Sequence, residues 1–125
     1  MRHSINANPV HDRYARYLVH EANWTSMATI ASRVPIVGDP FANVFSMSDG
    51  WGEWSTGVPY IYNMPLELSA MDLEQNPRAS LGISLTQTGY CREQGWNDQD
   101  PRCGHVILTG NMVKIGQCAA YTDTA

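Results

Sequence analysis

Charged side chains are scarce in this sequence, and lysine is almost absent. Aspartate, glutamate, lysine and arginine make up 16% of the 125 residues, and Lys114 is the single lysine beside seven scattered arginines. The formal net charge is −4, and no basic stripe is present that could neutralise a phosphate backbone. The composition therefore excludes nucleic acid as an expected direct partner.

Long apolar runs are absent as well. The longest uncharged stretches, 54–66 and 79–91, are broken by glycine or proline and fall short of the roughly 20 apolar residues that a membrane-spanning helix needs. Residues 1–10 contain no apolar core of a signal peptide. We therefore expect no membrane span, and we expect the signal peptide of a secreted protein to be missing from this chain.

Hydrophobic residues make up 43% of the chain, which suits one globular domain. A helix is predicted near the N-terminus, with the Asn-Pro pair at 8–9 as N-cap and first helical residue and an end near Ala22. A second, short helix is predicted from a cap at Ser69 to residue 75, closed by the Asn-Pro pair at 76–77.

Five further stretches combine β-branched, aromatic and alternating residues in the manner of strands. They are 24–31, 41–48, 58–63, 79–86 and 105–115, with Gly110 as a predicted bulge or point of close approach in the last. Strands joined by turns favour a mainly antiparallel barrel over a parallel α/β sheet. Five strands alone would leave one edge of the sheet unpaired.

A series of short motifs keeps a specific order along the chain. The motifs lie at 15–20, 28–30, 40–42, 46–50, 57–60, 76–77, 79–81, 85–88 and 108–110, together with Cys91 and Cys103. In this order they resemble the CREG family, glycoproteins of the FMN-binding split-barrel superfamily. The resemblance implies a mainly β fold with short helices, namely a six-stranded split β-barrel of the pyridoxamine-phosphate-oxidase-like type.

The resemblance also implies a function. CREG-like proteins are homodimeric, secreted or endolysosomal glycoproteins without a demonstrated reaction, which act in growth or differentiation control by binding a protein receptor or partner. The similarity covers residues 1–115 as a partial split-barrel domain and leaves 116–125 as a divergent tail. We expect the fold to be incomplete at the C-terminus, because the family's later helix, strands and glycosylation sites have no counterpart there.

A flavin-dependent oxidoreductase on the same barrel is the alternative function. Flavin-binding relatives hold the FMN phosphate with basic side chains, because a buried dianion without cations is costly. Between Arg33 and Arg78 the chain has no lysine, arginine or histidine, and Ser69 stands where those relatives usually have lysine. The hydroxyls of Ser46, Ser48 and Ser69 are weak candidates for contacts with FMN, or they face solvent and strand ends. We therefore expect no bound cofactor.

Cys91 and Cys103 enclose a polar loop of eleven residues, which predicts a disulfide. A metal site with His105 as a third ligand is the alternative, but no paired Cys-x-x-Cys spacing supports zinc. Asn23 begins an Asn-Trp-Thr glycosylation sequon, which together with a disulfide favours the secretory route. Cys118 in the tail is left without a predicted partner.

No catalytic residue is predicted, because the four histidines sit in no recognisable nucleophile motif. His20 is interpreted as a cap or a partly buried helix residue. Trp51 and Trp54 lie in a glycine-rich, acidic connection, where they form either an exposed contact surface or part of the core. The sequence leaves both interpretations open.

Overall fold

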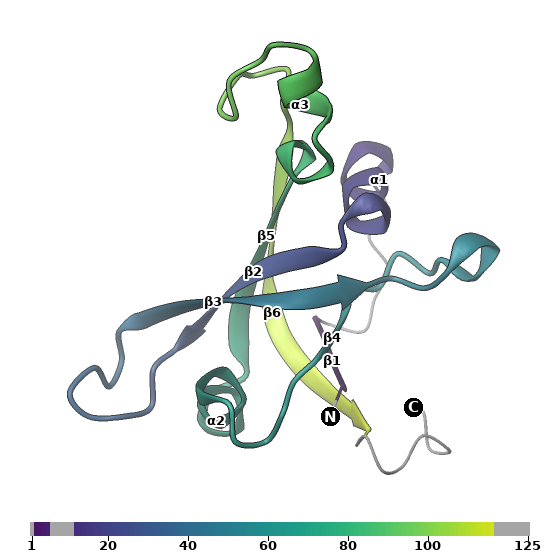
Figure 1. Cartoon of the computed structure of the whole chain (residues 1–125). Coiled ribbons are helices and arrows are strands. Elements are labelled where there is room, and N and C mark those ends of the chain that lie inside the picture. The colour runs from purple at the N-terminus through teal and green to yellow at the C-terminus, as the bar shows by residue number, and fades with distance from the viewer. Residues whose placement is uncertain (1, 6–11, 117–125) are drawn as a thin grey trace.

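Six strands form the body of the molecule (Figure 1). The computed structural model describes residues 2–5 and 12–116. The strands are β1 (Arg2–Ile5), β2 (Trp24–Ile30), β3 (Pro40–Ser48), β4 (Tyr60–Tyr62), β5 (Arg78–Ser84) and β6 (His105–Gly116). The helices are α1 (Arg13–Glu21), α2 (Leu68–Gln75) and α3 (Tyr90–Glu93), and two 3-10 turns are η1 (Gly52–Trp54) and η2 (Leu85–Thr88).

The strands close in the order β1-β4-β3-β2-β5-β6, and every neighbouring pair is antiparallel. This confirms the mainly β split-barrel class. The unpaired edge expected from five strands does not occur, because β1 pairs with β4 on one side and with β6 on the other. Strand β1 was not predicted, since its sequence, Arg-His-Ser-Ile, offers no apolar alternation to indicate a strand.

Strand β6 is long enough to serve two partners. Its first part pairs with β5 in one continuous register from His105 to Asn111, and its last part pairs with β1. The predicted bulge at Gly110 is therefore wrong for the pairing with β5. The register shifts instead between Arg2 and His3 of β1, where the barrel closes.

Helix α1 begins later than predicted. Its N-cap is Asp12, whose side chain accepts a hydrogen bond from the backbone N–H of Ala15 at 2.9 Å. The predicted cap at Asn8, with Pro9, lies outside the described residues. The helix ends at Glu21, close to the predicted end, and buries Leu18 and Val19 against the barrel.

Helix α2 also begins at another residue than the one predicted. Its N-cap position is Glu67, so Ser69 lies inside the helix, where it is buried and cannot act as the cap. The end of the helix is as expected, because α2 stops at Gln75 with Asn76 as its C-cap. Serine was a reasonable choice from propensity alone, and packing against the barrel overrides that preference.

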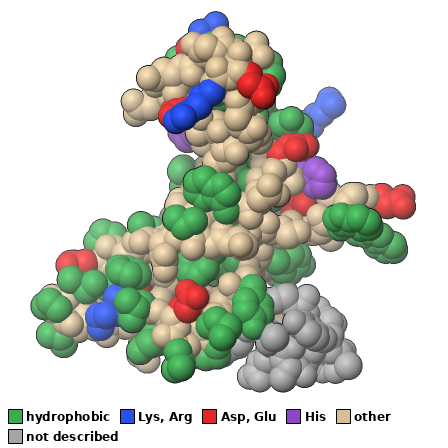
Figure 2. Space-filling view, in the orientation of Figure 1, with side chains coloured by type: hydrophobic (Ala, Val, Ile, Leu, Met, Phe, Trp, Pro, Cys, Tyr) green, Lys and Arg blue, Asp and Glu red, His purple; other side chains and the backbone are tan. Residues whose placement is uncertain are grey.

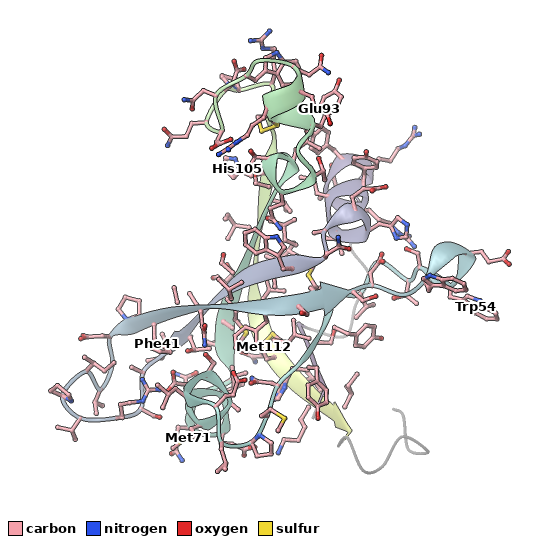
Figure 3. The ribbon with its side chains drawn as sticks, viewed as in Figure 1. Phe41, Trp54, Met71, Glu93, His105 and Met112 are labelled. Atoms are coloured by element: carbon pink, nitrogen blue, oxygen red, sulfur yellow. A yellow bond between two sulfur atoms is a disulfide. The ribbon has the colours of Figure 1, made fainter. Side chains whose placement is uncertain are left out.

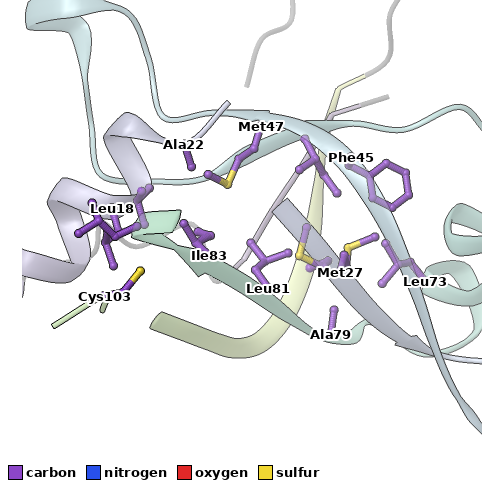
Figure 4. Packing of buried hydrophobic residues seen from close by; sticks show 14 of the residues in the cluster. Leu18, Ala22, Met27, Phe45, Met47, Leu73, Ala79, Leu81, Ile83 and Cys103 are labelled. Atoms are coloured by element: carbon purple, nitrogen blue, oxygen red, sulfur yellow. The ribbon is translucent and has the colours of Figure 1, made fainter. Parts of the chain in front are cut away.

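One hydrophobic cluster fills the barrel (Figure 4). Alternate residues of β2 and β5 point inward, among them Met27 and Leu81, which are both fully buried. Phe45 of β3 and Leu18 of α1 pack into the same cluster. Replacing a side chain such as Leu81 by alanine would cost about 2–5 kcal/mol, because the surrounding residues could collapse only partly.

Some connections between strands extend well away from this body. The connection between β3 and β4 extends to one side with η1 near its end, and the segment that contains α3 extends from the ends of β5 and β6 (Figure 1). No helix in residues 2–5 and 12–116 is long and apolar enough to cross a membrane.

Candidate interaction surface

The connection between β3 and β4 presents two tryptophans to solvent. We call residues 49–57 the tryptophan loop; its Trp51 and Trp54 side chains are 83% and 72% exposed. Figure 3 places Trp54 at the outer end of this segment, away from the barrel. Both side chains are therefore exposed, as the interpretation as a contact surface requires. The alternative, that they form part of the core, is wrong.

A buried carboxylate fixes the base of the tryptophan loop. Asp49 is 1% exposed, and its Oδ2 accepts hydrogen bonds from the hydroxyl of Ser55 at 2.6 Å and from the backbone N–H of Gly57 at 3.3 Å. The carbonyl oxygen of Asp49 accepts the backbone N–H of Thr56 at 2.8 Å. These contacts tie both ends of the loop to one residue, so the exposed rings sit on an ordered support.

The backbone of the loop is turned tightly around its glycine. Gly50 has a φ of 115°, a conformation that residues with a side chain rarely adopt. A Cβ at this position would also collide with the carbonyl oxygen of Trp54. The backbone N–H of Trp54 donates to the carbonyl of Trp51 at 2.8 Å, which closes the turn between the two rings. The backbone that carries both tryptophans is thus held in a tight turn.

Helix α1 supports the loop from the other side. The Nδ1 atom of His20 lies 2.9 Å from Oδ1 of Asp49, and Arg16 donates to the carbonyl oxygen of Ser55 at 3.2 Å. A hollow of about 410 Å³ opens between helix and loop. It is lined by Arg13, Arg16, Tyr17, His20 and Ser55. Arginine and tyrosine side chains of α1 therefore lie beside the tryptophan loop at Ser55.

A second hollow, of about 620 Å³, lies where β3 and β4 part. Its lining consists of Ser46, Met47, Ser48, Gly50, Tyr60, Ile61 and Tyr62. The structure thus brings two of the three serine candidates, Ser46 and Ser48, to one groove as exposed residues on the same face of β3. Ser69 is not part of this lining; it is buried in α2, and its hydroxyl has no hydrogen-bond partner among the described residues.

The groove does not fit the phosphate of FMN. Among the residues that line it, all of which the structure describes, none is lysine, arginine or histidine. Serine hydroxyls can donate hydrogen bonds to a phosphate but cannot balance its charge. The residues present are therefore a poor match for the one cofactor that the fold type implies.

Arg33, which precedes the long stretch without lysine, arginine or histidine, is bound to groups outside the groove. Arg33 donates to Oδ1 of Asp72 at 2.6 Å and to the carbonyl of Leu68 at 3.1 Å. Burial of Asp72 acts to raise the pKa of its carboxyl, but hydrogen bonds from Thr29, Ser32 and Arg33 outweigh burial and hold the pKa below its usual value. This cluster anchors α2 to the loop after β2.

The disulfide predicted from the sequence is present. Cys91 and Cys103 are bonded at an S–S distance of 2.05 Å, and both residues are buried. The disulfide links α3 to the end of the loop that precedes β6. A metal site with His105 does not form, because the two sulfurs are bonded to each other and His105 starts β6 opposite Ser84; no metal-ligand cluster occurs in residues 2–5 and 12–116.

The glycosylation sequon lies at the start of β2. Asn23 is exposed, whereas the sequon residue Thr25 is buried and its hydroxyl donates to the carbonyl of Ser26 at 2.8 Å. A glycan on Asn23 stays a prediction. Cys118 and the tail after residue 116 lie outside the described residues.

The anchoring role of Asp49 could not be predicted from the sequence. In the sequence this residue belongs only to the glycine-rich, acidic connection that contains Trp51 and Trp54. That Asp49 is buried and contacts His20, 29 positions earlier in the chain, depends on how α1 docks on the barrel. Sequence spacing carries no signal for that contact. His20, interpreted as a cap or partly buried helix residue, is partly exposed and bound to the loop.

Comparisons with known proteins give one consistent result. The family model described as "CREG, beta-barrel" matches residues 9–124. Protein CREG1 of Gallus gallus is 42% identical over 110 residues, which cover 86% of this chain and 57% of that protein. Protein CREG1 of Homo sapiens is 41% identical over 84% of this chain and 48% of its own length. Protein CREG2 of Mus musculus is 37% identical over 90% of this chain and 40% of its own.

The chain therefore spans only about half the length of the curated relatives it matches. One solved structure superposes with a TM-score of 0.58 at 22% identity, over 78% of this chain and 55% of that one. A likeness at this level of identity is a likeness of fold.

Proposed function

The chain belongs to the CREG β-barrel family, and from that premise we propose that it is a non-catalytic glycoprotein that acts by binding other proteins. We place it outside the cell or in the endolysosomal system, with a role in growth or differentiation control. The proposal includes a homodimer, as the family resemblance implies.

The exposed tryptophan loop carries the proposal. Tryptophan is enriched among the residues that dominate binding energy in protein interfaces. Trp51 and Trp54 are the large side chains of this loop, and Asp49 holds its base in place. A support that is ordered before binding reduces the conformational entropy lost on association. Figure 2 shows hydrophobic side chains at the end of this projection, next to an acidic one.

The disulfide supports the proposed location. Bonds between cysteines persist in oxidising compartments such as the secretory route and are rare in the cytosol. Cys91 and Cys103 form such a bond, and Asn23 is exposed at a sequon. Both observations agree with a protein that passes through the secretory pathway.

We do not propose a flavin-dependent activity. The groove between β3 and β4 holds the hydroxyls of Ser46 and Ser48 but, in its described lining, no cation for the FMN phosphate. We therefore propose that the barrel works without FMN and that its surface, rather than its groove, is functional.

Saturable binding to cells tests the proposal. The chain is secreted from a eukaryotic host, labelled with a fluorophore, and titrated onto cultured animal cells, with unlabelled protein as competitor. We expect competed, saturable binding that the double variant Trp51→Ala and Trp54→Ala weakens by about ten-fold or more, as loss of an interface hot spot does. Leu66→Ala, at a residue 90% exposed outside the loop, is the matched control. Equal binding by all three proteins would contradict the proposal.

A further inference from the structure

Helix α1 carries three basic side chains on the face that lies toward the tryptophan loop. Arg13, Arg16 and His20 all line the hollow of about 410 Å³ between helix and loop, together with Tyr17 and Ser55. Their spacing of three and four residues places them in a row along one side of the helix. Basic groups are therefore gathered in one hollow of a chain whose formal net charge is −4.

The two arginines are only partly used within residues 2–5 and 12–116. Arg13 is exposed and makes no hydrogen bond or ion pair there, since the neighbouring Asp12 caps the helix at Ala15 instead. Arg16 donates one hydrogen bond, to the carbonyl oxygen of Ser55, so the rest of its guanidinium N–H groups remain for another partner. Two like charges three residues apart repel each other, and an anion bound between them removes that repulsion.

The contact between His20 and Asp49 defines the third group. A carboxylate only accepts hydrogen bonds, so Nδ1 of His20 is the donor to Oδ1 of Asp49 at 2.9 Å. The carboxylate is itself held by the Ser55 hydroxyl and the Gly57 N–H, so the ring has a fixed support. Nε2 is the ring nitrogen that remains available, and in the neutral ring it accepts a hydrogen bond from a hydroxyl group.

These side chains select for three chemical features in one ligand. Guanidinium groups bind tetrahedral anions such as phosphate through paired, charge-assisted hydrogen bonds. The Nε2 atom of His20 requires a hydroxyl, and the Tyr17 ring, 52% exposed, offers an apolar face beside it. The volume of the hollow lies in the range of small-molecule sites and is more than a lone anion needs. A sugar esterified with sulfate or phosphate has the anion, the hydroxyls and a ring with an apolar face.

We propose that the hollow between α1 and the tryptophan loop binds a sulfate or phosphate ester of a sugar. Arg13 and Arg16 hold the anion, Nε2 of His20 accepts a sugar hydroxyl, and the ring of Tyr17 covers one face of the sugar. This site goes beyond the proposed protein binding, because Trp51 and Trp54 are not part of its lining.

Two defined esters test the inference on the whole secreted chain. The probes are glucose 6-sulfate and glucose 6-phosphate, with glucose, inorganic sulfate and inorganic phosphate as controls that lack either the anion or the sugar. Binding is followed by the backbone amide resonances of isotopically labelled protein. We expect saturable shifts centred on residues 13–20 and 55 with at least one ester, and binding of each control at least about ten-fold weaker. The ratio of the two ester affinities identifies the anion that the site takes.

Two arginine variants make the test specific. Arg13→Gln removes one anion-binding charge at a residue whose side chain supports no other described group, so the melting temperature should not change. Arg78→Gln makes the same change of charge at an exposed residue of β5 outside the hollow. We expect Arg13→Gln to bind the ester about ten-fold more weakly and Arg78→Gln to bind within about two-fold of the parent.

Equal binding by the two arginine variants would overturn the inference, as would the absence of saturable binding by both esters. Inorganic sulfate or phosphate bound as tightly as the esters would show a site for the anion alone, and tighter binding of a sulfotyrosine peptide would show a site for protein; either result contradicts a sugar site. The double variant Trp51→Ala and Trp54→Ala should bind the esters normally. Loss of cell binding in that variant with ester binding retained, or the reverse in Arg13→Gln, separates the failure of one proposal from that of the other.

Discussion

The imidazole Nδ1 of His20 lies 2.9 Å from Oδ1 of the buried Asp49. This contact joins helix α1 to the base of the tryptophan loop. The residues that order the loop are different from those that it presents to solvent.

The first prediction concerns that anchor. Asp49→Ala removes the acceptor of the Ser55 hydroxyl and the Gly57 N–H and leaves these donors unsatisfied, which should lower the free energy of unfolding by about 1–3 kcal/mol. The tryptophan fluorescence anisotropy should fall as the loop loosens. Glu53→Ala, an exposed acidic residue of the same loop, is the control and should change neither quantity. An unchanged anisotropy in Asp49→Ala would argue against an ordered loop.

The second prediction concerns the disulfide. Replacing Cys91 and Cys103 together by alanine should lower the free energy of unfolding by about 3 kcal/mol, because an open loop of this length gains freedom mainly in the unfolded chain. Urea unfolding followed by circular dichroism measures the change. The parent protein treated with reductant should show a comparable loss, and a double variant as stable as the parent would contradict the assigned role.

The third prediction concerns pH. Burial of His3 in β1, helped by the nearby positive charge of Lys114, lowers its pKa from 6.5 to about 4, while Glu74 acts in the opposite direction. The unfolded chain therefore takes up this proton at a higher pH than the folded chain does. The stability that neutral His3 contributes is fully present above about pH 6.5 and is lost as the pH falls toward 4.

The size of this effect can be measured by urea unfolding at several pH values. We expect the free energy of unfolding to fall by about 2 kcal/mol across that interval, after a discount for solvent screening. His3→Gln removes the titrating group and should flatten the dependence between pH 6.5 and 4. An equally steep dependence in the variant would show that another group is responsible.

The sequence predicted the repeated features of the fold and missed those that depend on contacts between distant segments. Alternation identified the strands around Met27 and Leu81, since one face of each is buried in the core. Strand β1 carries no such alternation and forms because β4 and β6 leave a place between them. In the same way, a cap at Ser69 was plausible locally, but the docking of α2 put this residue in the interior.

The candidate functional residues show the same difference between local patterns, which were predictable, and contacts between distant segments, which were not. The disulfide between Cys91 and Cys103 was predictable because the two residues enclose a short polar loop, as the cysteines of a disulfide often do. The exposure of Trp51 and Trp54 was one of two open interpretations, and their side chains are 83% and 72% exposed in the structure. The grouping of Ser46 and Ser48 in one groove follows from strand alternation, whereas the separation of Ser69 from that groove does not.

The central claim is that this barrel works by binding and holds no flavin. The most direct test is the flavin content of the intact chain, purified from a eukaryotic secretory host, desalted, denatured, and measured by flavin fluorescence against protein concentration. The account predicts no stoichiometric flavin, even after incubation with excess FMN before desalting. One FMN retained per chain would contradict it.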